Sequence, residues 1–141
     1  MNTMEIKLLT PNAKVPTYAH KGDAAFDIYT TESLQLFPGQ RHTFKTGIAS
    51  RFSPKYFVNL LGRSGLAHHH GVVVLGGVID SSYRGEWGII VLNSSPNVLT
   101  VTEGDRIVQG VFLPVPKFKI KLVKELKASA RGTKAYGSTG R

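Results

Sequence analysis

Residues 76–86 have the sequence GGVIDSSYRGE, and they carry the side chains best suited to chemistry. The acid Asp80 follows the apolar pair Val78-Ile79 directly, and glycines stand on both sides of the polar stretch. Because glycine permits tight reversals and close backbone approach, the pattern predicts a β-hairpin that presents Asp80 at its rim. A carboxylate there could take a proton from an attacking water molecule. Taken alone, the segment fits an ordinary hairpin with a solvated Asp equally well.

Three other loops favour the chemical interpretation. Arg63 offers a planar fork for phosphate oxygens, Ser64 adds a hydroxyl, and Gly65 lets the chain come close. Leu66-Ala67 starts a short helical turn whose free N–H groups attract anions. Residues 104–109 form a turn that leads into a strand with the polar Gln109 on it. Residues 131–140, RGTKAYGSTG, combine cations, an aromatic ring, hydroxyls and glycines, which suits an arm that closes over a base and a polyphosphate.

These segments resemble the five ordered motifs of the trimeric deoxyuridine triphosphatases (dUTP pyrophosphatases). The matching segments are residues 23–28, 63–67, 77–85, 104–109 and 131–140, which together span nearly the whole chain. Each segment alone is common among proteins, whereas five in order at these spacings are specific to the family.

The resemblance implies hydrolysis of dUTP to dUMP and pyrophosphate by Mg²⁺-assisted, in-line attack of water on the α-phosphate. Such an activity keeps uracil out of DNA and supplies dUMP for dTMP synthesis. Asp80 matches the general base. Asp27 matches the acid that supports the Mg²⁺ shell through water, although a buried Asp satisfied by backbone amides explains Asp27 equally simply.

The resemblance also assigns the binding residues. The backbone of Gly77, Val78 and Ile79 would bind the uracil edge and reject cytosine, whose C4 group has the opposite hydrogen-bonding polarity. Tyr83 would pack against the deoxyribose and exclude a 2′-hydroxyl, unless it only caps the hairpin. The remaining matches are Arg63, Ser64, Gly65, Gln109 and Arg131 on the phosphates, Tyr136 stacked on the base, and Gly137, Ser138 and Thr139 around the γ-phosphate. Alternatively, Gln109 is an ordinary polar residue on the solvent-exposed face of its strand and contacts no substrate.

The chain departs from the family pattern in three places. Tyr136 stands where most members have Phe, Lys134-Ala135 replaces a Gly-Gly pair, and Gly62 stands where Pro often precedes the arginine. None of these changes removes a chemical group that the reaction needs. We expect Asp105 and Arg106 to pair with each other around their turn.

The rest of the sequence predicts short strands that position these loops. Apolar runs recur between turn signals, at residues 5–9, 25–29, 34–37, 43–50, 56–61, 72–75, 88–92, 98–102, 107–115 and 118–123. This spacing predicts an all-β sandwich or barrel with one helical turn after Ser64. The resemblance implies a distorted jelly-roll (β-clip) sandwich and a homotrimer with a swapped C-terminal arm. We expect one domain over residues 1–127 and an arm over 128–141.

Composition limits the remaining classes. The chain has 141 residues, no Cys and no apolar run that approaches the ~20 residues of a membrane span. Its start lacks the layout of a secretory signal, so we expect a cytoplasmic protein, or one of the host-cell cytoplasm or nucleus if viral. Net charge is +9, and eight of the 18 basic residues lie from Lys117 onward with one acid among them, Glu125. Such asymmetry suggests an anionic partner, with nucleic acid as a secondary one.

Two other functions remain open. A related enzyme of the same fold deaminates dCTP, which would need a Glu near the base, and Glu86 follows the predicted reversal. A basic β-domain that binds nucleic acid would fit the net charge, although aromatic residues are not interleaved as a stacking platform requires. His68-His69-His70 is a poor metal site because three adjacent imidazoles point in different directions.

Overall fold

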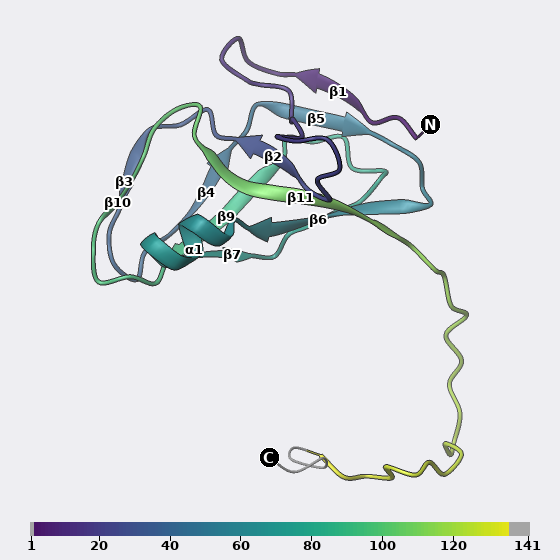
Figure 1. Ribbon diagram of the computed structural model, residues 1–141. Coiled ribbons are helices and arrows are strands. Elements are labelled where there is room, and N and C mark those ends of the chain that lie inside the picture. Colours follow the sequence, from purple (N-terminus) through teal and green to yellow (C-terminus); the bar gives the residue numbers. More distant parts are fainter. Residues whose placement is uncertain (1, 136–141) are drawn as a thin grey trace.

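A computed structural model describes residues 2–135, and its regular elements are almost all β-strands. Tyr136, Gly137, Ser138 and Thr139 lie outside the described residues, so their predicted roles stay predictions. The elements are β1 (Glu5–Leu8), β2 (Phe26–Tyr29), β3 (Leu34–Leu36), β4 (Arg41–Lys45), β5 (Ile48–Arg51), β6 (Tyr56–Gly62), α1 (Ser64–His70), β7 (Val72–Leu75), β8 (Val78–Ile79), β9 (Gly88–Asn93), β10 (Leu99–Val101) and β11 (Arg106–Pro114) (Figure 1).

The strands form antiparallel sheets that share one apolar core. The largest sheet has the strand order β2-β11-β6-β8, a second has the order β4-β9-β7, and β1-β5 and β3-β10 form two-stranded pairs. Phe26 and Val58 of the first sheet and Phe44 and Ile89 of the second belong to the same buried cluster. The predicted all-β sandwich of jelly-roll type is therefore confirmed, and so is the helical turn after Ser64.

A sharp corner at Gly47 divides the run predicted as one strand over residues 43–50. Gly47 has a φ of +65°, and a Cβ there would lie 2.7 Å from the Cβ of Ala13, so only glycine fits without strain. The hydroxyl of Thr46 donates a hydrogen bond to the carbonyl of Trp87 at 2.7 Å, and the amide of Trp87 donates to the carbonyl of Ile48 at 2.9 Å. The corner thus anchors the segment that leads into β9.

The hairpin predicted over residues 76–86 is wrong. The strand before the loop, β8, pairs with β6, whereas the strand after it, β9, pairs with β4 and β7. Gly76 and Gly77 have φ angles of +68° and +99°, which lets the chain pass from one sheet to the other between β7 and β8. Asp80 therefore lies on a loop that connects two sheets.

The strand predicted over residues 118–123 does not form within this chain. The last strand, β11, ends at Pro114, and the following segment runs away from the sheets (Figure 1). Phe118, Ile120 and Leu122 are 84%, 97% and 96% exposed. The alternation seen in the sequence is real, but its apolar face has nothing to pack on in a single chain. Among the described residues, no helix has the length and hydropathy to cross a membrane.

The crowding around Gly110 leads to a stability prediction. Gly110 lies in β11, where a Cβ would come within 2.6 Å of the Phe26 ring and 3.0 Å of Val58. Gly110→Ala should therefore lower the free energy of unfolding by about 1–3 kcal/mol through overpacking. Gly62→Ala is the matched control, because the nearest atom to its Cβ would be 3.9 Å away. Urea denaturation would measure both, and equal losses would contradict this description of the core.

Candidate active site

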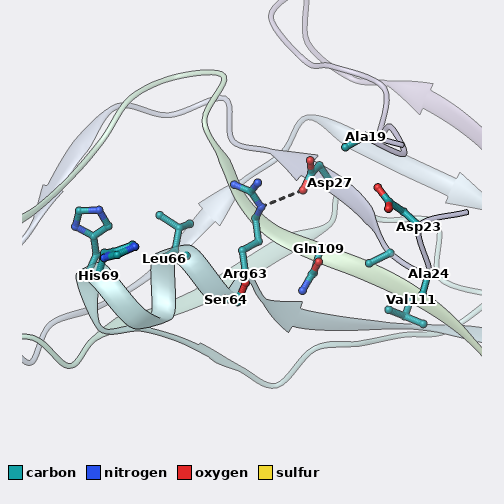
Figure 2. A pocket seen from close by; sticks show the side chains of 13 residues that line it. Ala19, Asp23, Ala24, Asp27, Arg63, Ser64, Leu66, His69, Gln109 and Val111 are labelled. Carbon is teal, nitrogen blue, oxygen red and sulfur yellow. Dashed lines mark ion pairs between the residues drawn. The ribbon is translucent and has the colours of Figure 1, made fainter. Parts of the chain in front are cut away.

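The first group of predicted residues lines one cavity, which we call the Arg63 cavity (Figure 2). Its volume is about 690 Å³, and it lies between the residues before β2, the start of α1 and the middle of β11. Of the predicted site residues, it contains Asp27, Arg63, Ser64, Gly65 and Gln109. The sequence motifs that contain them are up to 86 positions apart, and the pairing of β11 with both β2 and β6 brings them together.

Asp27 is the buried centre of this cavity. Its side chain is 10% exposed, and its Oδ1 lies 3.0 Å from Nε of Arg63. Its Oδ2 accepts a hydrogen bond from Nη1 of Arg106 at 3.3 Å. Asp27 is buried and its oxygens have partners, as one of the two interpretations expected. The partners, however, are two guanidinium groups and not the predicted backbone amides. The predicted pairing of Arg106 with Asp105 is wrong, since Asp105 instead accepts the amide of Thr102 at 2.8 Å.

The other polar groups of the Arg63 cavity are held by backbone contacts. Arg63 also donates from Nη1 to the carbonyl of Arg106 at 2.8 Å, which fixes the guanidinium at the junction of β6 and β11. Gln109 donates from Nε2 to the carbonyl of Gly62 at 2.9 Å, and this contact orients its amide at the cavity wall. Ser64 and Gly65 are exposed at the first turn of α1. The arrangement is a rigid, hydrogen-bonding surface suited to phosphate oxygens.

A second cavity contains the other predicted group, and we call it the Asp80 cavity. It has a volume of about 520 Å³ and is lined by Gly77, Val78, Ile79, Asp80 and Tyr83, together with Thr43, Leu60, Leu75, Glu86, Gly88 and Ile90. β8 is the edge strand of its sheet, so its outer side presents backbone groups that no described strand pairs with. The carbonyl of Gly77 accepts the amide of Leu60 at 2.7 Å. Val78 and Ile79 therefore lie on an open backbone edge beside the cavity.

The loop that carries Asp80 is held at its far end by buried contacts. Trp87 is fully buried, and its Nε1 donates to Oγ of Ser50 at 3.2 Å. Arg84 donates from Nη1 to the carbonyls of Ser81 at 2.7 Å and Ser50 at 3.2 Å. These bonds tie both the middle and the end of the loop to the sheet. Asp80 itself is exposed and free to meet solvent or a ligand.

Tyr83 closes the loop, whereas its role against the deoxyribose stays a prediction. Its hydroxyl donates to the carbonyl of Glu86 at 3.0 Å, which closes the loop, and its ring still lines the Asp80 cavity. A Cβ at Gly85 would collide with the Tyr83 ring, so glycine is required beside it. Glu86 accepts the amide of Gly47 at 2.8 Å, which makes its carboxylate a part of the corner described above.

The two cavities have no lining residue in common. The structure therefore assembles the predicted phosphate residues in one place and the predicted base, sugar and water-activating residues in another. Arg131 joins neither group, because it lies in the extended arm, where its side chain donates to the carbonyls of Lys134 at 3.1 Å and Ala135 at 3.0 Å. Among the described residues of this chain, the predicted site residues thus lie in more than one place.

Three titratable residues that line the Arg63 cavity were not among the predicted site residues. Asp23, His69 and His70 line it beside the predicted residues. Asp23 lies within the first motif, which could have signalled its position. The histidines were considered only as metal ligands, and no group of three or more His, Asp or Glu side chains among the described residues is placed to hold a metal ion.

Comparisons with known proteins show the family of the chain. The dUTPase family model matches residues 11–140, which is nearly the whole chain. The chain belongs to the dUTPase family. It is a hydrolase, and it is similar to the deoxyuridine 5′-triphosphate nucleotidohydrolase of Clostridium tetani, with 42% identity over 99% of this chain and 97% of that protein.

Solved structures show the same fold. The dUTPase of Staphylococcus bacteriophage 80alpha, solved with dUpNHpp, has a TM-score of 0.92 and 30% identity, with complete coverage of both chains. The dUTPase of phage phi11 of S. aureus, described with a structural Mg(II) ion, has a TM-score of 0.81 and 27% identity, over 90% of this chain and all of that one.

The donor set of the Arg63 cavity suits a Mg²⁺ ion that arrives with phosphates rather than one held by the protein alone. Both oxygens of Asp27 are already paired with guanidinium groups, and Asp23 is the only other carboxylate among the lining residues. Mg²⁺ commonly binds through substrate phosphates and a few carboxylates while it keeps several waters. The cavity fits that mode.

Removal of the Asp27 charge should destabilise the fold. Asp27→Asn preserves size but leaves two guanidinium groups without their shared anion, which should cost about 1–3 kcal/mol of unfolding free energy. Asp105→Asn is the matched control, since Asp105 is exposed and contacts one backbone amide. Thermal or urea unfolding would compare the two variants, and an Asp27→Asn protein as stable as the Asp105→Asn protein would contradict this role.

Proposed function

We propose that this chain hydrolyses dUTP to dUMP and pyrophosphate, at sites that join the Arg63 cavity of one subunit to the Asp80 cavity of another in a homotrimer. One observation carries the proposal: the predicted site residues fall into two cavities that share no residue. A nucleoside triphosphate has a base and a phosphate chain at opposite ends, which matches one cavity for each end.

The arm supports the trimer. An exposed apolar face at Phe118, Ile120 and Leu122 is costly in water, and burial of such side chains contributes roughly 1.5–3 kcal/mol each. A sheet edge or groove on a second copy of the chain is the simplest surface that could bury these three side chains. An arm that crosses in this way would carry Arg131 and the residues after it, Tyr136, Gly137, Ser138 and Thr139, to a site of another subunit.

In the proposed reaction, Asp80 accepts a proton from a water molecule while the oxygen of that water bonds to the α-phosphorus. The bond from that phosphorus to the bridging oxygen breaks, and pyrophosphate leaves. Arg63, Ser64 and Gln109 hold phosphate oxygens in line with the water. Mg²⁺, when bound to the phosphates, neutralises charge that develops during the transfer. Asp27 keeps Arg63 in position, and Asp27 and Asp23 are the carboxylates of the cavity that would support the ion through water.

Specificity follows from the Asp80 cavity. The open edge of β8 would bind the uracil edge, and a cytosine there would leave a buried polar group unpaired. The Tyr83 ring would occupy the volume that a 2′-hydroxyl needs. dCTP deamination is disfavoured, because the carboxylate of Glu86 is occupied by the amide of Gly47. The activity would keep uracil out of DNA and supply dUMP for dTMP synthesis, in the cytoplasm, with nucleic acid as a secondary partner of the basic arm.

Loss of the general base should abolish turnover and spare binding. Asp80→Asn should lower kcat for dUTP by about 100-fold to 10,000-fold. Pyrophosphate release would be measured with dUTP and dCTP, ammonia release with dCTP, and dUpNHpp binding separately. Ser82→Ala is the matched control, since Ser82 is exposed on the same loop and does not line the cavity. Near-normal turnover by Asp80→Asn would remove Asp80 from the reaction, and ammonia from dCTP would favour a deaminase.

Mixed trimers should test the sharing of sites. Ser64→Asp places a negative charge against the phosphates while suiting the first turn of a helix, so the fold should persist. Trimers mixed from Ser64→Asp and Asp80→Asn chains should recover activity at about a quarter of their sites, where each half comes from an intact chain. Mixing Asp80→Asn with a chain that carries both substitutions should give no recovery. Inactive but demonstrably mixed trimers of the first kind would mean that each site is built within one subunit.

A further inference from the structure

His69 and His70 lie at the end of α1 and line the Arg63 cavity, yet the proposed mechanism does not use them. In Figure 2, His69 lies on the opposite side of Arg63 from Asp23, beyond Leu66. The cavity therefore extends past the predicted phosphate residues, and its far end is built from imidazoles. A ligand that reaches from Arg63 along α1 would meet both of them.

No described carboxylate neutralises these imidazoles. Of the acids in the same cavity, Asp27 is paired with Arg63 and Arg106, and Asp23 accepts the amide of His20 at 2.8 Å. His70 also lines the neighbouring cavity with Arg63, Asp105 and Arg106, where Asp105 accepts the amide of Thr102. The adjacent rings, with centroids 4.7 Å apart for His68 and His69 and 6.3 Å for His69 and His70, add further nitrogen donors.

The charge balance therefore favours an anion at this end of the cavity. A protonated imidazole donates from both ring nitrogens and forms charge-assisted hydrogen bonds with phosphate oxygens. The end of a helix also favours a cation, because the last carbonyls carry partial negative charge. Protonation adds a positive charge to an imidazole, so the protonated pair would bind a phosphate more tightly than the neutral pair.

We propose that His69 and His70 form a proton-dependent subsite for the β- and γ-phosphates of the substrate. This inference rests on the proposed function, and it makes the affinity for triphosphates greater at pH 6 than at pH 8. The α-phosphate must lie near Asp80, which belongs to the other cavity. The histidines therefore act on the outer phosphates, and a nucleoside monophosphate does not reach them.

The test compares binding of dUpNHpp and dUMP to the wild type and to the double variant His69→Gln/His70→Gln, at pH 6 and pH 8. Both residues are exposed, so the variant should fold normally, which circular dichroism would check. At pH 6 the wild type should bind dUpNHpp about 3–10-fold more tightly than the variant, and this ratio should shrink at pH 8. The ratio for dUMP should stay near one at both values. Each ratio compares wild type and variant with the same ligand at the same pH, so protonation of the ligand affects both proteins equally and cancels.

Two further variants complete the test. His68→Gln is the matched control, since His68 lies on the same turn but does not line the cavity. It should follow the wild type. His69→Lys carries a permanent charge and should bind dUpNHpp more tightly than the wild type at pH 8. A ratio that does not change with pH, an equal effect on dUMP, or the same loss in His68→Gln would overturn the subsite. If wild-type protein releases no pyrophosphate from dUTP at pH 8, the proposed function itself fails.

Discussion

The carboxylate of Asp27 is the constraint on which the phosphate side of the molecule depends. It lies in β2, and its two guanidinium partners come from the junction of β6 with α1 and from the start of β11. One buried acid thus sets the relative positions of three segments from different parts of the chain. Because Arg63 is held through Nε and Nη1, its orientation toward the cavity is fixed before any ligand arrives. Such preorganisation reduces the ordering cost of binding.

The loop with Asp80 is positioned by different means. Its support is apolar burial of Trp87 and a set of backbone contacts at the Gly47 corner, so the loop is rigid at its ends and open at Asp80. The two halves of the site are built independently within one chain. Under the proposed function such a design makes activity depend on assembly, and the exposed apolar residues of the arm give a physical reason for subunits to associate.

Local sequence patterns predicted most of the elements. Short apolar runs between turn residues identified β1, β6, β7, β9 and β11 nearly to their ends, because each of these strands packs side chains against the shared core. What local pattern cannot supply is strand partnership. The hairpin at residues 76–86 was predicted from turn residues alone, whereas β8 and β9 belong to different sheets. The alternation at residues 118–123 is typical of a strand, but its partner is absent from the single chain.

For the site, too, the sequence identified the residues but not all of their partners. The motif order identified Arg63, Gln109, Asp80 and Tyr83, all of which line one of the two cavities. The predicted partner of Arg106 was wrong, because the turn suggested its neighbour Asp105. In the structure β11 pairs with β2, where Tyr29 lies opposite Arg106, and Asp27, two residues along β2, pairs with the guanidinium group. His69 and His70 were set aside because their spacing suits no metal, and only the cavity shows that they face the same space as Arg63.

The central claim is that one site draws its phosphate residues and its base residues from different chains. A crystal structure of the protein with dUpNHpp and Mg²⁺ tests it most directly. We expect each ligand to contact Arg63 and Gln109 of one chain, and Asp80 and Tyr83 of a neighbour. A ligand that contacts Arg63 and Asp80 of the same chain would contradict it.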